Sequence, residues 1–290
     1  MAEGRTIQAM LALTLVLLLA VAVALTQEEP RSAGSQVTVV TTFPGLKPDI
    51  LSIAGECNVT VLELVAGDPH TAQLSPSQAR LLAEADIIVT MGHTPADMKA
   101  EELASGIVID IPSIEGVKLL NIPGDGVNLH YPIYDPENYL AFLDALARAM
   151  EGAGCTPDYN STTARAARSL IDNYKGAANG LVGVADQPFI QYAVAWLGVD
   201  VRIILRQGEH SQASGMMLDE AARLLDEGAV AFIAVDENGE PITSEGEWLL
   251  REAQDRGAPL VRVPAPYLER TTPELLEYVI EGLEPLLGRG

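Results

Sequence analysis

Basic side chains are scarce in this chain of 290 residues, in which 18 lysines and arginines stand against 40 aspartates and glutamates. The formal net charge of −22 at pH 7 repels a phosphate backbone, and no basic patch is present to overcome that repulsion. Nucleic acid is therefore excluded as a partner. An acidic surface also raises the local concentration of cations, although many acidic surfaces serve only to keep a protein in solution.

Aromatic residues are also few, at 5% of the chain, whereas hydrophobic residues of all kinds make up 48%. The core must then consist mainly of valine, isoleucine, leucine and alanine, which is typical of parallel strands buried on both faces. Only two cysteines are present, Cys57 and Cys155. In an exported protein they are candidates for a disulfide, but their long separation in sequence leaves the pairing open.

Residues 1–36 are typical of a targeting segment followed by a tether. Ala9 to Leu25 is an unbroken run of mostly aliphatic residues, and Arg5 precedes it. Its length lies between that of a signal-peptide apolar region and that of a membrane span, so cleavage and retention as an anchor both stay open. No cysteine precedes Cys57 to accept a lipid. We expect an exported protein at the outer face of the cell membrane, anchored through this segment or secreted.

Strand-like and helix-like segments alternate along the rest of the chain, which predicts an α/β fold with parallel sheets and right-handed crossovers. A helical segment divides the alternation into two halves. We therefore predict two Rossmann-like lobes, residues 37–156 and 180–290, joined by a single connecting helix within 157–179. Strands are expected at 37–42, 59–65, 86–90, 106–111, 181–185, 199–205, 230–235 and 260–263, and helices at 47–54, 76–85, 96–104, 137–152, 188–196, 217–226, 245–256 and 273–287.

An imidazole follows the second predicted strand directly. Gly67-Asp-Pro-His70 comes after the strand at 59–65, and Ser75-Pro-Ser-Gln78 then supplies an N-cap hydroxyl, a proline at the first helical position and a capping-box glutamine. In open parallel sheets ligands bind beyond the carboxyl ends of the strands. His70 is therefore a candidate ligand on a short turn between two rigid elements.

Other candidate ligands also follow predicted strands or lie in loops. His93 and His130 are in the first half, and in the second half Asp186 follows one strand while Asp236 and Glu240 follow another. Imidazoles facing carboxylates would suit a divalent transition metal. Each carboxylate also has a structural interpretation, as a helix N-cap for Asp186 and as part of a tight turn for the other two.

Several motifs, taken in order, resemble the metal-binding proteins of zinc and manganese ABC importers, the cluster A-I solute-binding proteins. The similarity covers most of residues 37–290 and weakens toward the end. The motifs are Val37 to Pro44, Gly67 to His70 with Leu74 to Ser77, Ala83 to Asp86 leading to Met91-Gly-His93, Asn128 to Tyr131 with Asp135 to Asn138, and Asp186 to Phe189 followed by Tyr192.

The resemblance implies that one Zn²⁺ or Mn²⁺ ion is held between the lobes as a transported ligand and delivered to a membrane permease, with no reaction catalysed. His70 matches the first ligand of the family and His130 the second. Asp186 stands at the third position, where the family has histidine or glutamate. Asp236 or Glu240 stands at the fourth, and family spacing slightly favours Glu240.

Two further histidines receive a weaker interpretation. His93 is interpreted as a loop histidine on the cleft side that does not bind metal. His210 is interpreted as a plain loop histidine, with the alternative that it approaches the cleft and replaces a missing imidazole. The alternative functions are a family relative that has lost metal binding and recognises another small ligand or a partner protein, and a metallohydrolase. The hydrolase is disfavoured because no general base is paired with a candidate metal-bound water.

Overall fold

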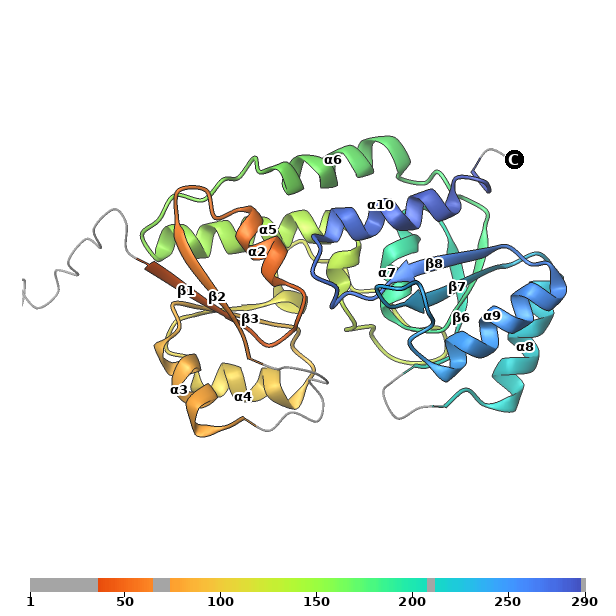
Figure 1. Ribbon diagram of the computed structural model, residues 1–290, viewed down its shortest axis with the longest axis horizontal. Helices are drawn as coiled ribbons and strands as arrows, with labels where there is room; N and C mark the ends of the chain where they lie inside the picture. Colours follow the sequence, from red (N-terminus) through yellow and green to blue (C-terminus); the bar gives the residue numbers. More distant parts are fainter. Residues whose placement is uncertain (1–35, 65–73, 208–211, 288–290) are drawn as a thin grey trace, which may run out of the picture.

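The computed structural model describes residues 36–64, 74–207 and 212–287, and two four-stranded parallel sheets form the centres of its two lobes (Figure 1). The first half contains β1 (Gln36–Thr41), α2 (Lys47–Ser52), β2 (Asn58–Glu63), α3 (Pro76–Glu84), β3 (Ile87–Thr90), α4 (Pro95–Leu103), β4 (Ile107–Asp110), the 3-10 helices η1 (Ile111–Ser113) and η2 (Pro132–Tyr134), and α5 (Pro136–Gly152). The second half contains α6 (Thr162–Tyr174), β5 (Val182–Ala185), α7 (Phe189–Ala195), β6 (Asp200–Ile204), α8 (Gly215–Asp226), β7 (Val230–Val235), α9 (Ser244–Arg256), β8 (Leu260–Pro264) and α10 (Thr272–Leu283).

The two sheets have the same topology. Their strand orders are β2-β1-β3-β4 and β6-β5-β7-β8, and all pairings are parallel, which confirms the predicted fold class. In each sheet the strand order reverses at the first strand of the lobe, between β1 and β3 and again between β5 and β7. Ligands of open α/β sheets bind outside the carboxyl ends of strands at such a point. The segments that follow β1, β3, β5 and β7 are therefore the places to look for a site.

Local sequence signals explain where several helices begin. At the start of α3 the Ser75 hydroxyl accepts a hydrogen bond from the backbone N–H of Gln78, and the Gln78 side chain accepts one from the backbone N–H of Ser75. Thr94 and Asp97 form the same reciprocal arrangement at the start of α4. The capping box predicted at Ser75 is confirmed, and it fixes the point at which the chain re-enters regular structure.

Helix α6 carries the chain from the first sheet to the second, and α10 packs beside it on the same side of the molecule (Figure 1). The helix is shorter than the predicted segment 157–179. It begins at Thr162 because the Ser161 hydroxyl accepts a hydrogen bond from the backbone N–H of Ala164 and caps the helix there. It ends at Tyr174, and Gly176 follows with a φ of 75°, a left-handed conformation that favours glycine.

One apolar core runs through both lobes. The largest cluster of buried side chains includes Val37 of the first sheet and Phe232 of the second. Tyr134 belongs to this cluster, and its hydroxyl donates a 2.8 Å hydrogen bond to the carbonyl oxygen of Pro264 in β8. Opening the lobes widely would expose this shared apolar surface to water, at about 25 cal/mol for each Å². We therefore expect small adjustments of the lobes on ligand binding.

A buried carboxylate also ties the lobes together. Asp49 of α2 is fully buried and accepts hydrogen bonds from the Tyr139 hydroxyl at 2.7 Å, from the backbone N–H of Thr272 at 2.9 Å and from the Thr272 hydroxyl at 2.8 Å. Thr272 is the first residue of α10, so a side chain from the first lobe satisfies the amino end of a helix from the second. Burial raises the pKa of Asp49 to about 6, against the opposing effect of these hydrogen bonds.

This pKa predicts how stability depends on pH. An aspartate titrates near 3.9 in an unfolded chain, so between about pH 4 and pH 6 the folded protein binds more protons at Asp49 than the unfolded chain does. The proton-linked part of Asp49's contribution to stability is thus fully present below about pH 4 and is lost as the pH rises through 6, whereas its hydrogen bonds to Tyr139 and Thr272 remain. Asp49→Asn cannot ionise, so its free energy of unfolding relative to wild type should rise by about 2 kcal/mol between pH 4 and pH 7. Urea titrations of both proteins at the two pH values test this. Equal changes in the unfolding free energy of the two proteins between these pH values would contradict it.

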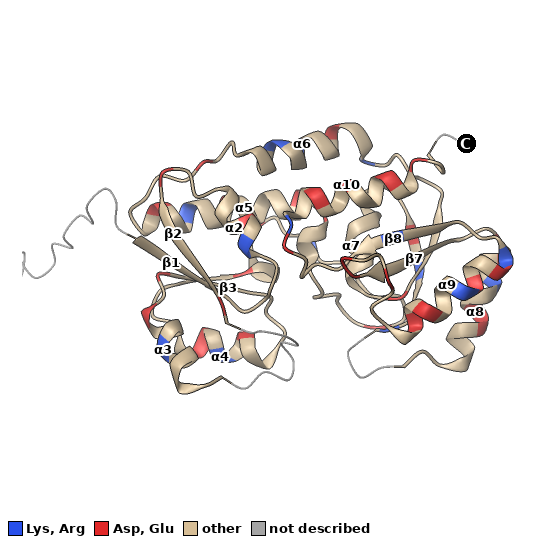
Figure 2. Cartoon of the chain, in the orientation of Figure 1, with Lys and Arg blue, Asp and Glu red and all other residues tan. Residues whose placement is uncertain are grey.

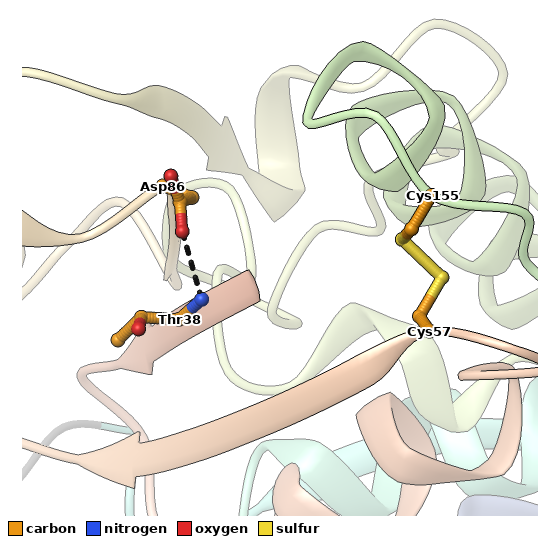
Figure 3. The surroundings of a disulfide bond; sticks show 4 residues. All are labelled: Thr38, Cys57, Asp86 and Cys155. Carbon is orange, nitrogen blue, oxygen red and sulfur yellow. Dashed lines mark hydrogen bonds between the residues drawn. A yellow bond between two sulfur atoms is a disulfide. The ribbon is translucent and has the colours of Figure 1, made fainter. Parts of the chain in front are cut away.

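Cys57 and Cys155 form a disulfide in the structure (Figure 3). Their Cα atoms are 5.3 Å apart, and the bond joins the residue before β2 to the segment after α5 across a sequence separation of 98. Near the same edge of the sheet, a carboxylate oxygen of Asp86 accepts a 2.9 Å hydrogen bond from the backbone N–H of Thr38 (Figure 3). Cys57 lies at the amino end of its strand, whereas ligand-binding loops lie at the carboxyl ends.

Removing the disulfide should therefore lower stability and leave ligand binding intact. Closing a loop of about 100 residues in the unfolded chain is worth about 4.7 kcal/mol in the chain-entropy account, and native disulfides typically contribute 2–5 kcal/mol. We expect Cys57→Ser with Cys155→Ser to unfold at a lower urea concentration, with a loss of about 3–4 kcal/mol, and to bind a ligand as tightly as wild type does. An unfolding free energy within about 1 kcal/mol of wild type would contradict the expectation.

Acidic side chains are distributed over both lobes, and basic ones are few (Figure 2). Several of the basic side chains are paired with acidic neighbours: Arg256 contacts Asp226 and Glu252, and Lys118 and Lys175 both contact Glu137. Surface pairs of this kind contribute little to stability, about 0–1 kcal/mol each. Within the ranges that the structure describes, no helix has the length and apolar character needed to cross a membrane.

Candidate metal centre

His130 lies where the two lobes meet, on a loop that is held by the second lobe. The amide of buried Asn128 donates hydrogen bonds from Nδ2 to the carbonyl oxygen of Pro188 and to the side-chain oxygen of Gln191, both at 2.9 Å. These two acceptors fix the orientation of the amide, so its oxygen faces His130. The oxygen accepts a 3.0 Å hydrogen bond from the backbone N–H of His130 and a 3.2 Å hydrogen bond from Nδ1 of the His130 ring. The half-buried His130 ring is therefore oriented by a residue that is bonded to the second lobe.

The backbone beside His130 is strained. Tyr131 has φ 52° and ψ 58°, and it is the one non-glycine residue with positive φ in the described part of the chain. The centroid of its buried ring lies 5.1 Å from the ring centroid of Phe43 and 4.9 Å from that of Tyr134. The ring centroid of Tyr134 lies 5.9 Å from that of Phe189 in the second lobe. Such conformations cost about 1–3 kcal/mol, persist only where packing enforces them, and gather at functional sites.

His93 is carried by the tight turn that follows β3. Asp97 organises this turn, because its carboxylate accepts hydrogen bonds from the backbone N–H groups of Met91, His93 and Thr94 and from the Thr42 hydroxyl. Burial acts to raise the pKa of Asp97, but these hydrogen bonds outweigh it and the pKa lies below its usual value. The half-buried His93 ring is thus placed by an ionised, buried carboxylate.

Asp186 follows β5, as predicted, and it is fully buried. One carboxylate oxygen accepts a 2.8 Å hydrogen bond from the backbone N–H of Ala234 in β7, and the other accepts a 2.8 Å hydrogen bond from the Thr243 hydroxyl at the start of α9. Burial raises its pKa to about 7, in spite of these bonds. A Cβ atom added to Gly246 would lie 2.7 Å from the same carboxylate, so that position has room only for glycine.

Asp236 and Glu240 lie in the turn that follows β7. The Asp236 carboxylate accepts hydrogen bonds from the backbone N–H groups of Asn238 at 2.8 Å and Glu240 at 3.0 Å. The bond from Glu240 is the main reason that the pKa of Asp236 lies below its usual value. Glu240 is exposed, and its own backbone carbonyl accepts from the backbone N–H of Asp236 at 2.9 Å. The turn is therefore closed by the side chain of Asp236.

The structure brings His93 and His130 together, with ring centroids 5.2 Å apart and ring planes inclined at 58°. The second-lobe carboxylates of Asp186 and Asp236 accept hydrogen bonds from groups of their own lobe. His70 and His210 lie outside the described residues. In the part of the chain that the structure describes, no three side chains of histidine, cysteine, aspartate or glutamate are grouped as a metal site would require.

Sequence reasoning missed the roles of two residues in this region, Asn128 and Asp97. The interpretation of His93 as a non-liganding loop histidine stays a prediction, although its position after β3 is the same kind of position that marked His70 as a candidate. Asn128 belongs to one of the family motifs, but the sequence does not show that Asn128 and Asp97 orient the two imidazoles, because these roles depend on contacts with Pro188 and with Met91.

Two parallel α/β lobes, joined by a helix and presenting oriented imidazoles at the lobe junction, define a class of two-lobed binding protein. A family model described as zinc-uptake complex component A, periplasmic (ZnuA), matches residues 39–254. The match covers well over half of the chain, so the protein belongs to the ZnuA family.

Solved structures share the fold at low identity. The periplasmic zinc-binding protein TroA from Treponema pallidum is 18% identical with a TM-score of 0.64, over 88% of this chain and 100% of that one. A crystal structure of ZnuA is 16% identical with a TM-score of 0.63, over 85% and 98%. FpvC from Pseudomonas aeruginosa, solved with Mn²⁺, is 17% identical with a TM-score of 0.63, over 87% and 100%. Among curated proteins, no sequence matches the chain.

Proposed function

We propose that this protein is the exported binding component of an ABC importer, which captures one Zn²⁺ or Mn²⁺ ion between its lobes and delivers it to a membrane permease. The ion is the transported ligand, and the protein catalyses no reaction. Membership of a family of periplasmic zinc-uptake components supports the proposal, as do the similar folds of TroA, described as zinc-binding, and of FpvC, solved with Mn²⁺.

The observation that carries the proposal is the way His130 is held. Its Nδ1 faces the oxygen of the Asn128 amide, which can only accept a hydrogen bond, so Nδ1 carries the proton and Nε2 carries the lone pair. A histidine that binds a metal typically donates its other ring N–H to an oxygen in this way. Asn128 is anchored in turn to Pro188 and Gln191, so the first lobe and the second share in placing this imidazole.

The proposed ligands are His70 and His130 from the first lobe and Asp186 with Asp236 or Glu240 from the second. The contact of Asn128 with Pro188 supports the inclusion of Asp186, since it places the His130 loop against the segment that follows β5. Each oxygen of the Asp186 carboxylate accepts one hydrogen bond in the structure and has a second lone pair. Nitrogen and oxygen ligands together accept both zinc and manganese, and zinc binds more tightly at equal supply.

Export is supported by the disulfide between Cys57 and Cys155, since disulfides form and persist mainly in oxidising compartments. The acidic surface is compatible with a cationic ligand, because it raises the concentration of cations near the protein. Residues 1–36 are proposed to direct the chain to the outer face of the membrane, as a cleaved signal or as an anchor.

Calorimetric titration of the metal-free protein with Zn²⁺ and with Mn²⁺ tests the proposed function. We expect saturation at one ion for each chain and tighter binding of zinc. A titration without heat or saturation for either ion would contradict metal capture and would favour a relative that recognises another small ligand or a partner protein. Metal-dependent turnover of ester or phosphate substrates, abolished by His130→Ala, would favour a metallohydrolase instead.

A further inference from the structure

Two imidazoles from distant parts of the sequence meet at the carboxyl edge of the first sheet. His93 follows β3, and His130 lies in the loop before η2, yet their ring centroids are only 5.2 Å apart. The resemblance to metal-importer proteins assigned His130 to the metal and left His93 aside. Their proximity makes His93 a second candidate for a nitrogen ligand at the same place.

The hydrogen bonding of the His93 ring selects the tautomer that binds metals through Nε2. Its Nδ1 lies 3.0 Å from the carbonyl oxygen of Met91, which can only accept, so Nδ1 carries the proton. His130 has the same arrangement toward the Asn128 amide oxygen. Both rings therefore carry their lone pair on Nε2, and in both an oxygen atom orients the ring as in known metal sites.

The His93 turn is rigid before any ion binds. The Asp97 carboxylate accepts from the backbone N–H groups on both sides of the turn, at 3.2 Å from Met91 and 2.9 Å from Thr94, as well as from that of His93 at 3.2 Å. Asp97 is buried and also bonded to Thr42 at the end of β1. A ligand that is held in place in this way loses little conformational entropy on binding, which raises affinity.

The spacing of the two rings fits coordination of a single zinc ion. Imidazoles that bind one Zn²⁺ through Nε2 at about 2.0–2.1 Å, with a tetrahedral angle at the metal, have ring centres about 5 Å apart. The observed centroid distance of 5.2 Å agrees with that value. Imidazole nitrogen suits zinc, whereas manganese favours carboxylate and carbonyl oxygen.

We infer that His93 is a metal ligand paired with His130, and that this added imidazole sets a preference for Zn²⁺ over Mn²⁺. The inference rests on the proposed function, because it adds a ligand to the same site. It also explains how the protein compensates for the absence of a histidine at the third family position, where Asp186 stands buried and hydrogen-bonded.

Competitive titrations of the full chain with Zn²⁺ and Mn²⁺ test the inference. We expect His93→Ala to weaken zinc binding by about 100-fold and manganese binding by less than 10-fold. His93→Asp, which replaces the imidazole with a carboxylate, should restore manganese binding more than zinc binding. Met98→Ala, on the exposed face of the following helix, is the matched control and should bind both ions as wild type does.

Imidazole ¹⁵N chemical shifts of the wild-type protein give a second readout that does not depend on a variant folding. The chain has four histidines, so the spectrum can be assigned, and we expect Nε2 of His93 to shift on addition of zinc. Wild-type zinc affinity in a folded His93→Ala, or an unshifted His93 Nε2 in zinc-saturated protein, would overturn the inference and leave the proposed function standing. Absence of zinc binding by wild type would overturn both.

Discussion

Replacing His130 with alanine is expected to weaken zinc binding by at least about 100-fold, with little effect on folding. Loss of a residue that only supports a ligand typically costs 10- to 100-fold in metal affinity, and loss of the ligand itself should cost more. Because the ring is only half-buried, its removal leaves no large cavity in the core. Calorimetric or competitive titration with Zn²⁺ measures the change.

Val127→Ala is the matched control, because Val127 is on the same loop and 53% exposed. Its zinc affinity should stay within about 2-fold of wild type. His130→Ala with wild-type affinity, in a protein whose circular dichroism is unchanged, would show that His130 is not a ligand. Reduced affinity in both variants would show that the effect comes from the loop and not from the imidazole.

Replacing Asp49 with alanine should lower the free energy of unfolding by about 3 kcal/mol. Three buried donors, the Tyr139 hydroxyl and the backbone and side chain of Thr272, would lose their acceptor at about 1–3 kcal/mol each. Removing the carboxylate also removes its own burial cost, of about 3 kcal/mol from its raised pKa, so the net loss is smaller than the sum. Urea unfolding at pH 7 measures the difference.

The control for this prediction is Asp144→Ala, which breaks an exposed ion pair with Arg148 on α5 and should cost less than about 0.5 kcal/mol. Equal effects of the two substitutions would contradict the role assigned to Asp49. Because Asp49 caps α10 from the other lobe, we also expect amide exchange to increase at the first turn of α10 in Asp49→Ala and to stay unchanged in Asp144→Ala.

The fold was predictable because each local signal agrees with the global arrangement. Strand β7 consists of apolar residues that are buried throughout, and β3 is a buried run of three apolar residues and a threonine. The Ser75 side chain marks the start of a helix, because serine is a typical N-cap residue. The contact between Asp49 and Thr272 was not predictable, since it joins residues 223 apart and exists only after both lobes have folded.

The candidate site was predictable only in part. Strand ends and a family resemblance singled out His130 and Asp186, but the sequence has no signal for what each side chain contacts. Asp186 binds the backbone of Ala234, and His93 reaches His130 from a loop that lies more than thirty residues away in sequence. Both contacts form because the ends of different strands lie close together in the fold. The sequence of a single loop does not show which other loops will lie beside it.

The measurement that tests the account most directly is anomalous diffraction at the zinc absorption edge from crystals of the zinc-loaded protein. We predict one strong peak between the lobes, about 2.0–2.1 Å from Nε2 of His130. A zinc-saturated crystal with no peak within coordination distance of His130, or with its peaks only on the outer surfaces of the lobes, would contradict it.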